Sequence, residues 1–421
     1  MRILLIANNI SGYKSTSRVN PYNGGGWITS LVSLLCKQRD TEIGMAFFMN
    51  GEPEKAEANG VTYYPIPIPK KTLKQKLIGF TYLKDETVDS LLWPAYEKAL
   101  LRAVEDFKPD IVQLFGSEGY QGLIADRAGC PVVLHIQGLL NPYWNAYCAP
   151  FISLQSFYFE DWNPSHIYLR FMNSVWWRRN CYREREILRR TKYFIGRTTW
   201  DQRVVKTYNH DAKYFYGAEV LRPVFYEDAV RMLPTKTVIV STISQPMYKG
   251  FDMVLKTASL MKHELGMDFE WRLFGNIDPR ITEQRLSLKH GELNIKLCGV
   301  ATASQLREEL LHCTLYMHPS YIDNSPNSLC EAQLLGVPVV ATNVGGVSSM
   351  ICQGHEHLLV PSNDPYQAAV LLAELSADEN KLIALGAQNK QMARQRHGHQ
   401  RIVDMLLETF TEIINDYHSQ P

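Results

Sequence analysis

Residues 320–346 read "SYIDNSPNSLCEAQLLGVPVVATNVGG", and this segment decides the fold. A polar loop around Asp323 leads into a predicted helix that begins at Asn327 or Ser328. Gly336 suits the left-handed cap of that helix, because glycine adopts positive φ at little cost. The apolar run "VPVVAT" then predicts a buried parallel strand. A loop, a helix and a strand in this order indicate one β/α unit of an open sheet.

The same alternation of short apolar runs and helical stretches occupies both halves of the chain. In the first half it predicts strands and helices at 1–7, 41–48, 61–68, 95–107, 110–116 and 131–138. In the second half it predicts them at 237–244, 269–275, 295–299, 303–313 and 315–320. We therefore expect an α/β protein of two similar domains with parallel sheets. Ligands tend to bind between such domains, at the carboxyl ends of the strands.

The stretch at 220–230 separates the two halves. Pro223 discourages helix there, so the stretch is predicted to be an extended connection. We place the domain boundary within it, which gives a first domain of residues 1–225 and a second domain of residues 226–398.

The composition of the 421 residues is that of a folded globular protein, with 45% hydrophobic and 21% charged residues. Lys and Arg number 44 against 43 for Asp and Glu, and this balance gives no global field that would favour nucleic acid as a partner. The cysteines are scattered without a CxxC pair, so neither a zinc site nor a disulfide framework is indicated, and a reducing cytosol fits best. Apolar runs are too short for a signal peptide or a membrane span, so we expect a soluble or peripheral protein.

The two carboxylates of the 320–346 segment, Asp323 and Glu331, lie near the start of its predicted helix. Free backbone N–H groups at a helix start bind diphosphates. Glu331 is one helical turn from Asn327, so near the same helix start it can accept hydrogen bonds from a pair of sugar hydroxyls. Taken singly, Asp323 would be an ordinary turn residue and Glu331 a solvated helix residue.

With the glycine turn at 345–346, this segment resembles the signature of the family 4 retaining glycosyltransferases, also called glycosyl transferases group 1. That signature is a carboxylate, seven residues and a glutamate, followed by "GVPVVATxVGG". The resemblance implies the GT-B fold, in which two Rossmann-like domains face across a cleft. It also implies that the last helix, at 399–421, packs back on the first domain.

The resemblance assigns roles to the motif residues. Glu331 would bind the nucleotide ribose, and Asp323 would face the donor sugar. Backbone amides near Asn327 and Ser328 would bind the phosphates. The family usually has glutamate and a glycine-rich turn where this chain has Asp323 and "NSP".

Two further segments resemble phosphate-binding parts of the family. In "STISQPMYKGF", Lys249 falls on the family's lysine, while Ser244 stands where arginine is common. Taken alone, Lys249 beside a glycine would be a solvated turn residue. The "NGGG" loop resembles the family's N-terminal glycine loop, and Gly25 and Gly26 are its candidates to approach the donor phosphates.

Three polar residues follow predicted strands of the first domain. His135 resembles the family's cleft histidine, although a lone histidine is more often a packed core residue. Glu118 and Arg197 are strand-end residues that are candidates to face the acceptor or the donor sugar.

The stretch from Arg170 to Arg190 holds seven arginines with aromatic residues among them. It is either a solvated helix with charge pairs or an interfacial helix that meets anionic lipid headgroups. The basic stretch at 69–76 adds to the second alternative.

The resemblance implies a retaining transferase that moves a sugar from a nucleotide-diphosphate-sugar to an acceptor hydroxyl. A lipid-linked or growing cell-surface polysaccharide is the expected acceptor, and no metal or other cofactor is expected. We expect the protein in the cytoplasm, with a peripheral contact to the inner face of the cell membrane left open. The alternatives are a nucleotide-sugar epimerase on a similar frame, which needs no acceptor, and a sugar-binding protein without chemistry.

Overall fold

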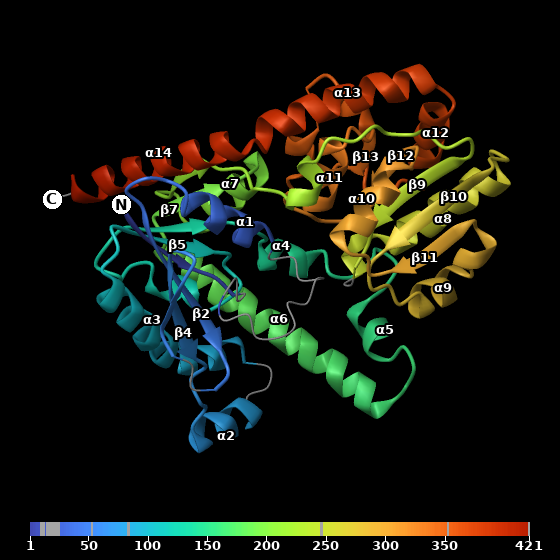
Figure 1. Cartoon of the computed structure of the whole chain (residues 1–421). Coiled ribbons are helices and arrows are strands. Elements are labelled where there is room, and N and C mark those ends of the chain that lie inside the picture. The colour runs from blue at the N-terminus through green and yellow to red at the C-terminus, as the bar shows by residue number, and fades with distance from the viewer. Residues whose placement is uncertain are drawn as a thin grey trace.

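The chain forms two α/β domains, which a computed structural model places side by side (Figure 1). The structure describes residues 1–8, 13, 26–51, 54–81, 85–244, 247–351 and 353–419, and for 78–81 it describes the backbone only. Gly25, one of the two predicted phosphate-binding glycines, lies outside the described residues. The two-domain α/β architecture that the sequence predicts is confirmed.

The first domain is built on an eight-stranded sheet. Its strand order is β3-β4-β2-β1-β5-β6-β7-β8, and all neighbours are parallel except the antiparallel β3 and β4. The strands are β1 (Arg2–Ile6), β2 (Glu42–Met49), β3 (Ala56–Ala58), β4 (Val61–Pro67), β5 (Ile111–Phe115), β6 (Val132–His135), β7 (Tyr193–Gly196) and β8 (Lys213–Tyr216).

The second domain is built on a six-stranded, wholly parallel sheet with the order β11-β10-β9-β12-β13-β14. The strands are β9 (Thr237–Thr242), β10 (Phe269–Phe274), β11 (Ile295–Gly299), β12 (Leu315–His318), β13 (Val339–Thr342) and β14 (Leu359–Val360). The predicted boundary at 225/226 lies in the connection between β8 and β9.

Helices cover both faces of each sheet. Those before β9 are α1 (Gly26–Leu35), α2 (Leu73–Thr81), η1 (Glu86–Leu92), α3 (Trp93–Phe107), η2 (Gln121–Ile124), α4 (Leu140–Asn145), α5 (Leu154–Tyr158), α6 (Pro164–Arg190), α7 (Thr199–Tyr208) and η3 (Pro223–Tyr226). Those after it are η4 (Met247–Lys249), α8 (Phe251–His263), α9 (Arg280–Leu286), η5 (His290–Glu292), α10 (Ala303–Leu311), α11 (Asn327–Leu334), η6 (Val347–Met350), η7 (Glu356–Leu358), α12 (Pro365–Ser376), α13 (Glu379–Arg396) and α14 (His399–His418).

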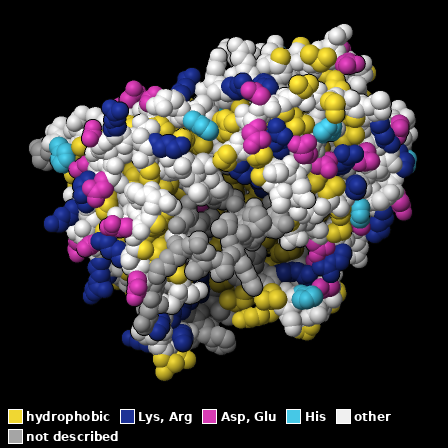
Figure 2. All heavy atoms as spheres, viewed as in Figure 1, with side chains coloured by type: hydrophobic (Ala, Val, Ile, Leu, Met, Phe, Trp, Pro, Cys, Tyr) yellow, Lys and Arg dark blue, Asp and Glu magenta, His cyan; other side chains and the backbone are white. Residues whose placement is uncertain are grey.

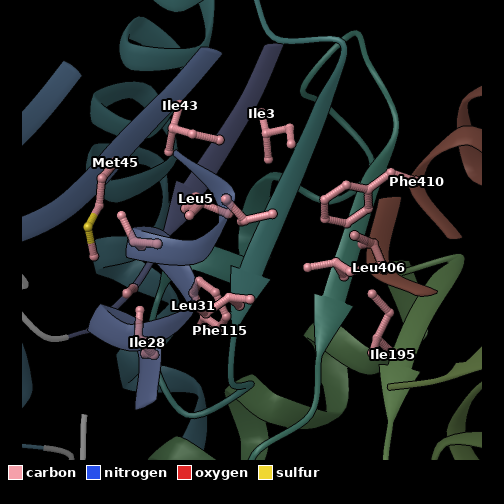
Figure 3. Packing of buried hydrophobic residues seen from close by; sticks show 14 of the residues in the cluster. Ile3, Leu5, Ile28, Leu31, Ile43, Met45, Phe115, Ile195, Leu406 and Phe410 are labelled. Atoms are coloured by element: carbon pink, nitrogen blue, oxygen red, sulfur yellow. The ribbon is translucent and has the colours of Figure 1, made fainter. Parts of the chain in front are cut away.

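The apolar strands form two cores per domain because successive side chains point to opposite faces of a sheet. On β1, Ile3 and Leu5 pack on one face of the sheet, and Leu4 and Ile6 pack on the other. The first of these faces is covered by α1 and by the distant helix α14, whose Phe410 is fully buried (Figure 3). The last helix of the chain is therefore part of the core of the first domain.

The strands and helices predicted in both halves are present. The helix of the 320–346 segment, α11, ends as expected, with Gly336 at a φ of 78°. The sequence patterns missed three short strands, β3, β8 and β14. Pro223 starts a single 3₁₀ turn within the otherwise extended connection. In the described ranges, no helix has the length and hydropathy that crossing a bilayer requires.

Candidate functional site

A cleft of about 490 Å³ lies between the two domains, at the carboxyl ends of their parallel strands. Both domains contribute to its walls. The first domain supplies Trp27, Gln137, Arg197 and Glu219. The second supplies the loops after β9, β10 and β12 together with the start of α11, among them Thr242, Ser244, Lys249, Gly275, His318, Asp323, Asn327 and Ser328. Five of the residues singled out from the sequence therefore meet in one cavity with Arg197 opposite them.

Asp323 is the centre of a charged cluster in this cleft. Lys249 Nζ donates to Asp323 Oδ2 at 2.7 Å, and His318 Nε2 lies 3.2 Å from the same oxygen. Burial disfavours ionisation of this carboxyl, but Lys249 and His318 outweigh it and hold the pKa of Asp323 below its usual range. The pair therefore places a buried carboxylate and a less buried ammonium side by side in the wall of the cleft.

The glycine turn at 345–346 shapes the loop that carries Asp323. Gly346 N donates to the carbonyl of Asp323 at 2.9 Å. A side chain at Gly345 would bring its Cβ to 1.9 Å from that same carbonyl oxygen, and the φ of Gly345 is 51°. The glycine turn at 345–346 thus exists because its backbone approaches the backbone of Asp323 too closely for a side chain.

The first domain holds the same loop from the other side of the cleft. Thr198 Oγ1 donates to Asn324 Oδ1 at 2.8 Å, and Asn324 Nδ2 donates to Asp201 at 3.0 Å. Arg197 donates to the carbonyl of Ser325 at 3.3 Å and forms an ion pair with Glu219. The conformation of the loop after β12 therefore depends on contacts from both domains.

The start of α11 is open to the cleft. Asn327 and Ser328 both line the cavity. Ser328 Oγ lies 2.9 Å from the hydroxyl of Tyr316, which fixes the first turn of the helix on β12. Ser244 also lines the cleft and is exposed.

Glu331 has a partner that the sequence did not suggest. Arg222 binds both of its carboxylate oxygens, Nε to Oε1 at 2.7 Å and Nη2 to Oε2 at 2.6 Å. Arg222 comes from the connection between the sheets, 109 positions earlier in the chain. No local spacing rule links two residues so far apart, so this pair is visible in three dimensions only.

His135 and Glu118 lie away from the main cleft. His135 is buried on β6 with Nδ1 3.0 Å from Gln113 Nε2, and the Trp27 ring packs against it. Burial lowers the pKa of His135 to about 3, so the ring is neutral at physiological pH. Glu118 lines a separate cavity of about 400 Å³ beside α6, where burial raises its pKa to about 7.

A smaller chamber of about 210 Å³ adjoins the main cleft and shares Ile243, Ser244 and Lys249 with it. Its other walls combine aromatic residues near α5, including Tyr147 and Phe157, with residues near α9. The space around Lys249 therefore extends beyond the main cleft.

Gly26 is the first residue of α1, and its backbone lies near Arg222. Among the described residues, no group of three or more His, Cys, Asp or Glu side chains is arranged to hold a metal ion.

Two parallel α/β domains that face one cleft in this way define the GT-B fold. Residues 234–378 match the family model described as "Glycosyl transferases group 1". The match lies in the second domain and includes the 320–346 segment, on which the resemblance to this family was based.

Curated relatives are similar to part of the chain. The "D-inositol 3-phosphate glycosyltransferase" of Streptomyces bingchenggensis is 30% identical over 116 residues, which are 28% of this chain and 25% of the relative. The "Putative teichuronic acid biosynthesis glycosyltransferase TuaC" of Bacillus subtilis is 39% identical over 85 residues, 20% of this chain and 21% of the relative. The chain thus spans about a quarter or less of the length of these two relatives.

Solved structures are similar over nearly the whole chain. The sucrose-phosphate synthase of Thermosynechococcus elongatus has a TM-score of 0.68 at 14% identity, with 99% of both chains covered. Anabaena Alr3699/HepE, solved in complex with UDP and glucose, has a TM-score of 0.62 at 13% identity, with 97% of this chain and 99% of that chain covered. At these identities the likeness establishes the fold.

Proposed function

We propose that this protein is a family 4 retaining glycosyltransferase that moves a sugar from a nucleoside diphosphate sugar to an acceptor hydroxyl. The observation that carries the proposal is the convergence of Lys249, Asp323 and the start of α11 in one cleft between the domains. A cation, a carboxylate and open helix amides are the groups that this reaction requires. The glycosyltransferase family of the second domain supports it.

The donor is proposed to lie along the second domain. The amides at Asn327 and Ser328, the hydroxyl of Ser244 and the glycines at 25 and 26 would receive the diphosphate, and Glu331 would receive the ribose. The Anabaena structure, which has a similar fold and was solved in complex with UDP and glucose, supports a nucleotide ligand.

The transition state of sugar transfer has positive charge on the ring and negative charge on the departing diphosphate. Lys249 and the α11 amides would stabilise the diphosphate, and they need little rearrangement because Asp323 already holds the Lys249 ammonium. Asp323 would face the sugar. Retention without an assigned nucleophile implies attack from the side of the leaving phosphate, which would accept the proton of the acceptor hydroxyl.

The first-domain residues have more indirect roles in this proposal. Arg197 holds the loop after β12 and lines the cleft opposite Lys249. His135 supports Trp27, which lines the cleft. Glu118 stays a sequence-based prediction for an acceptor contact, in its separate cavity.

The calorimetric test of the donor site uses UDP, GDP and ADP in the presence of EDTA. We expect wild type to bind one of them, and Glu331→Ala to bind it at least about tenfold more weakly, because it loses hydrogen bonds to a charged acceptor. Glu309→Ala removes a glutamate that pairs with Arg272 outside the cleft and should bind like wild type. Absence of binding by all three nucleotides in wild type would remove the basis of the proposed function.

The acceptor is proposed to be a lipid-linked or growing cell-surface polysaccharide. The name of the Bacillus relative, which refers to teichuronic acid biosynthesis, supports this class. Such an acceptor brings the enzyme to the inner face of the membrane. Five of the seven arginines at 170–190 already form ion pairs with carboxylates, so that helix has few cations left for headgroups.

The membrane contact is better supported at α2. Leu73 and Leu77 are 75% and 61% exposed there, next to exposed lysines at 70, 71, 74 and 76. Figure 2 shows blue and yellow side chains together at the lower edge, where Figure 1 places α2. Apolar and basic residues on one exposed helix suit an anionic bilayer surface.

Vesicle sedimentation tests this contact. We expect binding to vesicles with anionic lipid, and we expect it to fall as salt rises. The double change Lys71→Gln and Lys74→Gln should weaken partitioning by roughly tenfold or more, at about 1 kcal/mol for each lysine. Lys262→Gln and Lys289→Gln, in the second domain, serve as the control pair. Binding that is indifferent to lipid charge would contradict the proposal.

A further inference from the structure

Arg222 covers the Glu331 carboxylate, which is proposed to bind ribose. The Glu331 side chain is 2% exposed, whereas that of Arg222 is 32% exposed. The two hydrogen bonds are parallel and charge-assisted, the geometry in which a guanidinium binds a carboxylate most specifically. Arg222 thus fixes the rotation of the Glu331 carboxylate and keeps its own outer edge open to solvent.

Two opposing effects act on the pKa of Glu331. Burial raises the pKa of Glu331, and Arg222 opposes that rise. An ionised carboxylate is an acceptor only, with about four lone-pair sites, and the two hydrogen bonds from Arg222 use two of them. The remaining sites are suited to hydroxyl groups, which are donors.

Arg222 is itself held at a junction of three elements. Its guanidinium lies 4.9 Å from the centroid of the Phe225 ring. A Cβ built on Gly26, at the start of α1, would be 3.8 Å from Cγ of Arg222. The first domain, the connection and α11 therefore meet at this side chain, beside the proposed ribose position.

We propose that Arg222 is the positioning residue for ribose recognition: it holds the Glu331 carboxylate in the orientation in which its free lone pairs accept hydrogen bonds from the ribose hydroxyls. The inference rests on the proposed function, since it requires a ribonucleotide in the cleft. It adds Arg222, from the inter-domain connection, to the ribose contact that Glu331 of the second domain is proposed to make.

The test compares a ribonucleotide with its 2′-deoxy analogue by calorimetry. The probe is whichever of UDP, GDP and ADP wild type binds. Wild type should bind the ribonucleotide about tenfold or more tightly than the deoxy form, because a hydroxyl donates to a charged acceptor. In Arg222→Ala this preference should fall to within about threefold, while affinity for the deoxy form changes little. Arg222→Lys should restore part of the preference, since an ammonium also donates to the carboxylate.

Controls separate this inference from the function on which it rests. Arg272→Ala removes a guanidinium that also pairs with glutamates, outside the cleft, and should keep the full preference. Melting temperatures of all variants show whether they fold, and Arg222→Lys keeps the test valid if Arg222→Ala does not. Failure of wild type to bind any nucleotide would refute the proposed function itself.

Other outcomes overturn the inference alone. An unchanged preference in a folded Arg222→Ala would mean that Glu331 needs no positioning. Tighter ribonucleotide binding in Arg222→Ala would mean that Arg222 competes with ribose for the carboxylate. A wild type that binds both nucleotides equally would remove the ribose contact to Glu331, and the role of Arg222 with it.

Discussion

Replacement of Lys249 by alanine should lower the turnover of sugar transfer by about 10²–10³-fold, the usual loss when one charge-stabilising donor is removed from a transition state. Lys249 Nζ is 2.7 Å from Asp323, and Lys249 lines the same cleft as Ser328. The measurement is the rate of nucleoside diphosphate release from the nucleotide sugar whose base calorimetry identifies. A residual rate within threefold of wild type would contradict the assignment.

The same substitution leaves Asp323 buried without its lysine, which also costs stability. The double variant Lys249→Ala with Asp323→Ala removes both charges, so it should recover much of the melting temperature without recovering turnover. Lys256→Ala is the matched control, because Lys256 also pairs with an aspartate, Asp252, but does not line the main cleft. Loss of turnover in that control would show that the effect is structural.

Replacement of Phe410 by alanine should lower the free energy of unfolding by about 3–5 kcal/mol, the usual range for a large buried aromatic side chain. Phe410 is fully buried on α14 and packs against the first sheet with Leu406 (Figure 3). The deleted ring leaves a cavity in a core that is shared by residues from both ends of the chain.

Urea unfolding measures this effect. Tyr366→Ala is the comparison, since Tyr366 is 70% exposed on α12 and its loss should change stability by no more than about 0.5 kcal/mol. A loss below about 1 kcal/mol in Phe410→Ala would mean that α14 adds little to the core of the first domain.

Local patterns predicted the parts of the fold that local patterns determine. The "LLIA" and "VPVVAT" runs are buried strands because both faces of these sheets are covered, and Gly336 ends α11 because its φ is positive. The strands that were missed are short: β14 has two residues, and β3 pairs antiparallel at the edge of its sheet. Such strands are formed through their neighbours, which periodicity does not detect.

The candidate site divides in the same way. Asp323, Lys249 and the start of α11 were singled out because two motifs of the second domain, which lie within 80 positions of each other, contain them. Arg222, Arg197 and Thr198 were missed as partners of that motif, since each reaches it from the other domain or from the connection. Contacts across a domain interface leave no periodic signal in a single sequence.

The position of α14 has a consequence for how the protein is made. A ribosome completes the strands of the first domain long before it reaches residues 399–418, since synthesis proceeds at about 5–20 residues per second. Until then, the apolar face of β1 and its neighbours that α14 covers stays open to water. The second domain therefore folds before α14 has packed on the first domain. The first domain is synthesised first, but its core is completed last.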